Sequence, residues 1–134
     1  MDEQDRHTAG MQVRRAVLGD EHVDRAVAGT TSFTADFQEL ITRYAWGEIW
    51  ARPGLERRTR SLLTLAMLAT LGHDREFVMH VRAALRNGVT VDEIAEVLLQ
   101  LAIYAGVPVA NRAFALAQEA LIDEGALNPP GAST

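Results

Sequence analysis

The 134-residue chain contains no cysteine and no lysine. Without cysteine it cannot form a disulfide, a thiolate nucleophile, an iron–sulfur cluster or a thiolate zinc site. All 13 basic residues are arginine, and 18 acidic residues bring the net charge to −5. This charge argues against a general nucleic-acid binder, which needs a basic face.

A targeting signal and a long apolar run are also missing. The first ten residues are polar and acidic, unlike a secretory signal peptide. The longest strongly apolar run begins at Leu62 and reaches about half of the ~20 residues that a membrane span requires. We therefore expect a cytoplasmic protein with no membrane partner. The length and the 48% apolar content suit one domain with one core.

Helix signals dominate the chain, and no strand alternation is convincing. Apolar spacing and stop residues predict an all-α domain of six to eight short helices, over 6–18, 21–28, 35–46, 56–71, 74–86, 91–104 and 108–124. Thr34 and Asp74 are expected N-caps, Thr90 and Glu93 are expected to form a capping box, and Gly47 is expected to interrupt its helix. Helix 56–71 is apolar on nearly every side, which predicts a central, buried position. We expect a domain over residues 1–124 and a flexible tail over 125–134.

His80 stands at the edge of the apolar face of helix 74–86. It is either a structural histidine bonded to a backbone carbonyl or a group that acts in a cleft. His73 lies two turns earlier and Glu76 one turn earlier, so these three side chains could also meet a metal ion. Because Glu76 points away from the line of the two histidines, we expect no metal.

Two further groups of side chains suggest a ligand site. Trp46, Glu48 and Trp50 share one short segment, which is either aromatic packing or the wall of a small-molecule pocket. Arg58 and Arg60 stand at the start of helix 56–71, where cations oppose the helix dipole. They are either solvated or bind an acidic ligand or a neighbouring subunit.

Three segments carry a resemblance to a known family: WGEIWARPGLERRTRSLLTLAMLATLG, HVRAALRNGVTVDEIAEVLLQLAIYAGVP and ANRAFALAQE. They resemble the carboxymuconolactone decarboxylase family, and the resemblance extends over about Gly10 to Glu124. It implies an alkylhydroperoxidase-D-like fold and an obligate homotrimer or homohexamer. The reactive cysteines and the glutamate of the related peroxidases fall on His73, Glu76 and Ser61. Of the peroxidase site, this chain therefore keeps only the histidine, His80. The resemblance thus excludes thiol peroxidase chemistry.

The resemblance also implies an activity: cofactor-independent decarboxylation of 4-carboxymuconolactone to the β-ketoadipate enol-lactone, in the degradation of protocatechuate. His80 would donate a proton or stabilise the oxyanion, and Glu48 would orient His80 or shuttle the proton. Arg60 or Arg58 would bind a carboxylate of this dicarboxylate lactone, with Arg43 and Arg52 in reserve. The remaining candidates would line the substrate pocket: Trp46, Trp50 and Tyr104, with His73 and Glu76 in second rank.

Other functions stay open on the sequence. A cofactor-free enzyme of the same family could act on a different lactone or keto acid. A non-catalytic oligomeric binding protein would not turn over any of these acids. A metal hydrolase is the most distant alternative.

Overall fold

The computed structural model describes residues 2–132, and within this range it contains seven α-helices, one π-helix and no strand. This confirms the prediction of an all-α chain with six to eight helices. Contacts between Cα atoms divide the chain into two compact units, Met1–Arg57 and Arg58–Thr134. None of the helices within residues 2–132 has the length and apolarity that crossing a bilayer requires.

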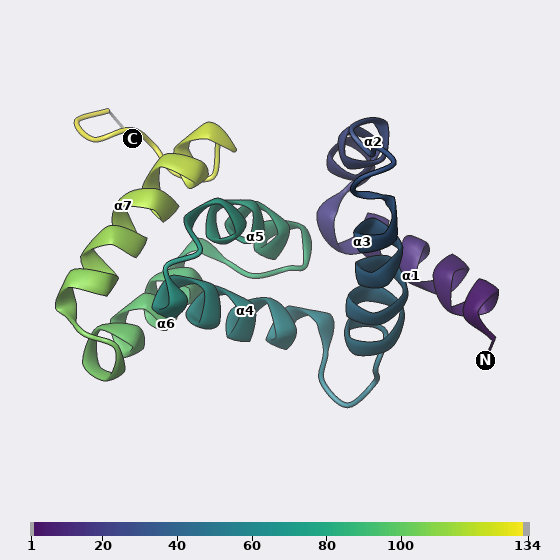
Figure 1. The fold of residues 1–134 in the computed structure, drawn as a ribbon. Coiled ribbons are helices and arrows are strands. Elements are labelled where there is room, and N and C mark those ends of the chain that lie inside the picture. Colours follow the sequence, from purple (N-terminus) through teal and green to yellow (C-terminus); the bar gives the residue numbers. More distant parts are fainter. Residues whose placement is uncertain (1, 133–134) are drawn as a thin grey trace. The chain divides into compact units, whose positions relative to one another are not determined.

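The first unit contains α1 (Glu3–Leu18), α2 (Asp20–Ala28), α3 (Ala35–Leu40) and η1 (Ile41–Trp50). The π-helix η1 continues α3 without a break (Figure 1). The predicted interruption at Gly47 is therefore wrong, because Gly47 lies inside η1. Thr34 is the N-cap residue of α3, as predicted, but its side chain does not cap the helix. Its Oγ1 accepts from the Thr31 amide instead.

Two glycines allow α1 and η1 to cross closely. A Cβ atom added to Gly10 would lie 1.9 Å from the Thr42 carbonyl oxygen. One added to Gly47 would lie 2.6 Å from the Arg6 carbonyl oxygen. Gly47 thus serves contact between helices rather than helix termination.

The second unit contains α4 (Arg57–Leu71), α5 (Asp74–Arg86), α6 (Val91–Tyr104) and α7 (Val107–Asp123) (Figure 1). The predicted capping box of α6 is confirmed, with Thr90 Oγ1 accepting from the Glu93 amide at 3.1 Å and Glu93 accepting from the Thr90 amide at 2.9 Å. The predicted cap by Asp74 is wrong. His73 occupies the N-cap position of α5, and the Asp74 carboxylate accepts from Arg112 on α7 instead.

The core of the second unit draws on all four of its helices. Phe77, Val81 and Ala84 are buried on one face of α5, as the sequence predicts. They pack with residues of the other helices and of the loop before α6: Leu65, Val89, Ile94, Leu98, Leu101, Ala113, Ala117, Ala120 and Leu121. Leu127 is partly buried against this cluster. The boundary at residue 124 and the flexibility of the tail stay predictions.

The prediction that α4 is buried on every side is wrong. Only Ser61 and Leu65 of α4 are buried, whereas Met67 and Leu71 are 58% and 67% exposed. Apolar side chains lie on several faces of α4, and the rest of this chain covers only some of these faces. Ile103 and Val107, at the junction of α6 and α7, are also 80% and 70% exposed.

Candidate active site

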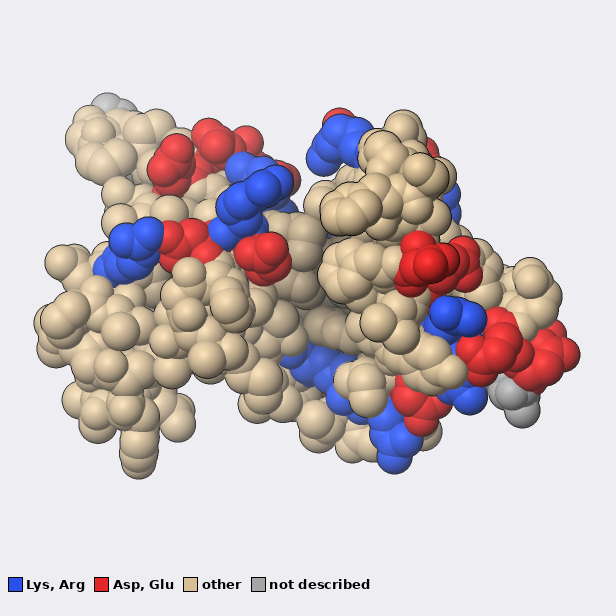
Figure 2. All heavy atoms as spheres, in the orientation of Figure 1, with Lys and Arg blue, Asp and Glu red and all other residues tan. Residues whose placement is uncertain are grey.

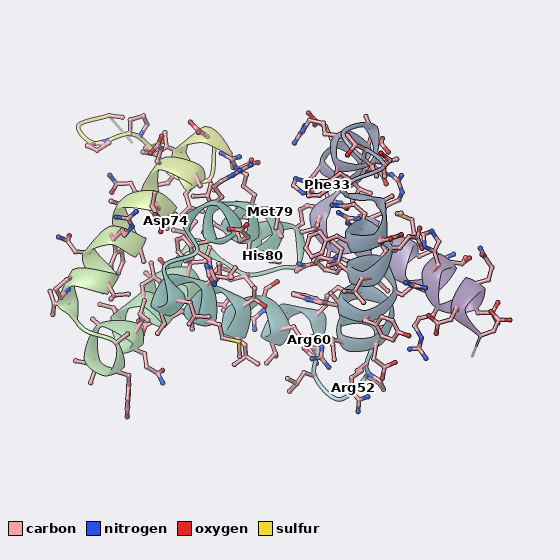
Figure 3. The ribbon with its side chains drawn as sticks, viewed as in Figure 1. Phe33, Arg52, Arg60, Asp74, Met79 and His80 are labelled. Atoms are coloured by element: carbon pink, nitrogen blue, oxygen red, sulfur yellow. The ribbon has the colours of Figure 1, made fainter. Side chains whose placement is uncertain are left out.

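The candidate proton donor, His80, lies in the middle of α5 (Figure 3). Its side chain is only 8% exposed, in a helix whose neighbouring Phe77 and Val81 belong to the core. His73 and Glu76 on the same helix are exposed. Within residues 2–132, no three acidic or imidazole side chains gather closely enough to hold a metal ion, so these two do not join His80 in such a group.

A hydrogen bond between α4 and the end of α5 fixes the helix that carries His80. Asn87 Nδ2 donates to Ser61 Oγ over 3.1 Å, and Ser61 is fully buried. A buried hydroxyl needs such a partner to offset its lost hydration. Local spacing does not predict this pair, because the two residues lie 26 positions apart. Ser61 directly follows Arg60, so the bond also holds the α4 turn that carries the candidate carboxylate ligand.

The two candidate arginines of α4 differ in their surroundings. Arg58 forms an ion pair with Glu93 on α6. The charge of Arg58 is thereby partly neutralised within its own unit, which explains how a cation is tolerated at this helix start. Arg60 is partly buried in the same turn (Figure 3). Both stay candidates for a substrate carboxylate.

Three candidates lie together on η1 in the first unit. The rings of Trp46 and Trp50 have centroids 5.3 Å apart and are tilted by 33°. Trp46 is almost fully buried. Glu48, between them in sequence, accepts from Arg6 Nη1 at 2.5 Å and from Arg52 Nη1 at 3.3 Å.

Two guanidinium groups thus hold the Glu48 carboxylate. The hydrogen bond to Glu48 raises the pKa of the Arg6 guanidinium. A carboxylate held by two guanidinium groups is better suited to fix a local charge than to carry a proton. Arg6 was not among the predicted residues, because its partner lies 42 positions away. The spacing of neighbouring residues cannot predict a hydrogen bond between residues so far apart in the sequence.

The other candidates differ in their exposure. Arg43 is partly buried and pairs with Glu3 at 3.4 Å, whereas Tyr104, at the end of α6, is 85% exposed. Tyr104 lines a surface pocket of about 460 Å³ between α4 and α6 with Leu62, Ala66, Thr70 and Gln100 among its other walls. The structure thus groups Trp46, Glu48 and Trp50 on η1, and places Arg60 and His80 on α4 and α5. That these two groups form one site stays a prediction.

Comparison with known proteins defines the class of this fold and site. Residues 35–119 match the model of the carboxymuconolactone decarboxylase family. The chain belongs to this family.

Three individual proteins are similar to this chain in sequence. The chain is 47% identical to the 4-carboxymuconolactone decarboxylase of Acinetobacter baylyi over 125 residues, which cover 93% of both chains. It is 45% identical to the nitrosuccinic acid decarboxylase of Metarhizium robertsii over 114 residues, or 85% of this chain and 80% of the relative. A 4-carboxymuconolactone decarboxylase sequence from Pseudomonas putida is 60% identical over 48 residues, which are 36% of this chain and all of that sequence.

Proposed function

We propose that this protein decarboxylates 4-carboxymuconolactone to the β-ketoadipate enol-lactone without a cofactor. The observation that carries the proposal is the 47% identity to the Acinetobacter baylyi enzyme over 93% of both chains. The reaction would belong to the degradation of protocatechuate, in the cytoplasm.

The substrate can accommodate the charge that the departing CO2 leaves behind. The carboxylate to be lost stands on the ring carbon that is conjugated, through a C=C bond, to the lactone carbonyl. When the C–CO2 bond breaks, its electron pair moves through that double bond into the carbonyl and gives a dienolate. A proton then adds to the carbon beside the carbonyl, and the remaining C=C bond is that of the enol-lactone. The protein therefore has to supply charge stabilisation and one proton, but no electron sink.

His80 is the group we assign to the protonation, or to a hydrogen bond with the dienolate oxygen. Its nearly complete burial supports this role, because a proton delivered from a dry position is not lost to solvent. Arg60 would hold the acetate carboxylate, which survives the reaction, since a guanidinium binds a carboxylate through two parallel hydrogen bonds. Glu48 would act as a fixed charge, and Trp46 and Trp50 as apolar walls.

A second substrate follows from the nitrosuccinic acid decarboxylase relative. Nitrosuccinate also carries two carboxylates, one of them on the carbon that bears an electron-accepting group. On loss of CO2 the nitro group takes the electron pair as a nitronate, and protonation of the same carbon completes the reaction. The demands on the protein are the same: one carboxylate to bind, one anion to stabilise and one proton to give.

The protein would act as a homotrimer or homohexamer. The support is a set of exposed apolar side chains on the second unit: Met67, Leu71, Ile103, Tyr104 and Val107. In Figure 2 the surface around the junction of α6 and α7 shows no charged side chain. Exposed apolar area of this kind is typical of a protein that buries it against other subunits.

The test measures CO2 release and loss of lactone absorbance with protein that has been dialysed against a chelator. We expect turnover of 4-carboxymuconolactone without any addition. Nitrosuccinate, assayed in parallel, should be turned over at a lower kcat/KM. Activity that returned only after a metal or an organic cofactor was restored would refute the proposal, and a preference for nitrosuccinate would select the second candidate.

A further inference from the structure

Arg14, in the first unit, is a buried cation that the proposed reaction does not use. It follows Gly10 by one turn on the face of α1 that crosses η1, and it is only 5% exposed. Its Nη1 donates to Thr42 Oγ1 at 3.3 Å, and its Nη2 donates to Gln38 Oε1 at 3.0 Å. Both acceptors are neutral groups.

The charge of Arg14 has no opposite charge beside it in the described part of the chain. No ion pair joins it to a carboxylate among residues 2–132, and its buried Nε has no hydrogen-bond acceptor there. Glu39, a carboxylate that lines the same pocket as Arg14, pairs with His7 Nδ1 at 3.1 Å. Burial lowers the pKa of the Arg14 guanidinium, and the charge of Arg15 adds to this effect. An arginine in such surroundings gains strongly from an anion.

Arg14 borders a pocket large enough for a small molecule. The pocket has a volume of about 280 Å³ and is lined by residues of α1, α2, α3 and η1 and by Thr30 after α2. Its polar wall is formed by groups that can hydrogen-bond: His7, Arg14, Thr30, Gln38, Glu39 and Thr42. Its apolar wall consists of Met11, Val27 and Ala35. All these residues belong to the first unit, so the pocket is complete within it.

We propose that this pocket binds a small organic acid, with the carboxylate on Arg14 and a short apolar body against Met11, Val27 and Ala35. The guanidinium fork can bind two carboxylate oxygens at once. The amide of Gln38 and the hydroxyl of Thr42 hold the fork in place. The ligand class is a carboxylic acid with a compact hydrocarbon part.

Benzoate is a suitable probe, and benzamide is its neutral control. We expect benzoate to bind the whole protein with a Kd on the order of 1 mM or below, and to shift the Nε–H signal of Arg14 in a nitrogen-15 NMR spectrum. Benzamide, which has the same shape without the charge, should bind at least about tenfold more weakly. Equal affinity for the two compounds would overturn the proposal, as would a wild-type spectrum that benzoate leaves unchanged.

Two variants test the role of Arg14 itself. Arg14→Met removes the charge and should abolish binding. Gln38→Glu keeps the size of the side chain and places a carboxylate 3.0 Å from Arg14 Nη2. It should raise the melting temperature, because the buried cation gains a partner, and weaken benzoate binding at least about tenfold. Arg86→Gln, an exposed change on α5, is the control and should bind like wild type. Unaltered benzoate affinity in a folded Gln38→Glu variant would overturn the proposal.

Discussion

At the scale of single residues, the proposed chemistry depends most on His80. His80→Ala removes the proton donor, and we expect kcat to fall about 10²-fold or more, the usual scale for general acid catalysis. The matched control is His22→Gln, which changes a histidine of α2 in the first unit and should leave kcat unchanged. Circular dichroism of both variants checks that the helices are intact. Near-normal kcat in folded His80→Ala would remove His80 from the mechanism.

The arginines of α4 give a second prediction at this scale. Arg60→Gln should raise KM for the lactone about tenfold or more, because a charged hydrogen bond to a carboxylate contributes roughly 1.5–3 kcal/mol. Arg57→Gln removes the same charge from an exposed position three residues earlier, and KM should stay close to the wild-type value. Steady-state kinetics of the two variants gives the comparison. An equal rise in both would mean that general electrostatic attraction, rather than contact, explains the effect.

At the scale of helices, the crossing of α1 and η1 depends on Gly10. Gly10→Ala places a Cβ 1.9 Å from the Thr42 carbonyl oxygen, a backbone atom that cannot turn away. We expect the free energy of unfolding to fall by about 2 kcal/mol or more, at the upper end of overpacking effects. Gly54→Ala is the control, since its Cβ would meet no atom within 4 Å. Urea unfolding of both variants measures the difference, and equal stability would show that the helices separate at little cost.

The link between α5 and α7 predicts a dependence on acid. Arg112 lowers the pKa of Asp74 below its ordinary value of 3.8 through their hydrogen bond. This contribution to stability is complete above the pKa of the unfolded chain, and it is lost as pH falls through the lower folded value. Between about pH 5 and pH 3 the melting temperature of wild type should therefore fall more steeply than that of Asp74→Asn. Parallel melting curves for the two proteins would contradict this.

The helices themselves could largely be predicted from the sequence, because their signals are local. The capping box at Thr90 and the apolar face around Phe77 depend on residues three or four positions apart. The local sequence does not predict the role of Gly47, because that role comes from contact with α1, far away in the chain. The same limit applies to the site. His80 stood out by its position on one helix, whereas the Arg6–Glu48 and Asn87–Ser61 bonds join separate elements.

At the scale of the whole molecule, α4 has apolar side chains that remain exposed to solvent in a single chain. The sequence shows which side chains are apolar and favour burial. It does not show whether they are buried by the same chain or by another copy of it. Met67 and Leu71 on α4 are exposed in this chain, although the sequence predicted burial. The proposed trimer or hexamer would reconcile the two observations, because it would bury this surface between subunits.

Ile103 offers the sharpest test of that assembly. It is 80% exposed at the end of α6, so Ile103→Arg leaves the core of the single chain untouched. If this surface lies between subunits, the variant buries an uncompensated charge there, and the assembly should dissociate towards the 14.7 kDa monomer. Leu55→Asp places a charge on an exposed apolar residue of the first unit and should keep the wild-type mass. Light scattering after gel filtration measures both, and a wild-type mass for Ile103→Arg would show that subunits do not meet at this residue.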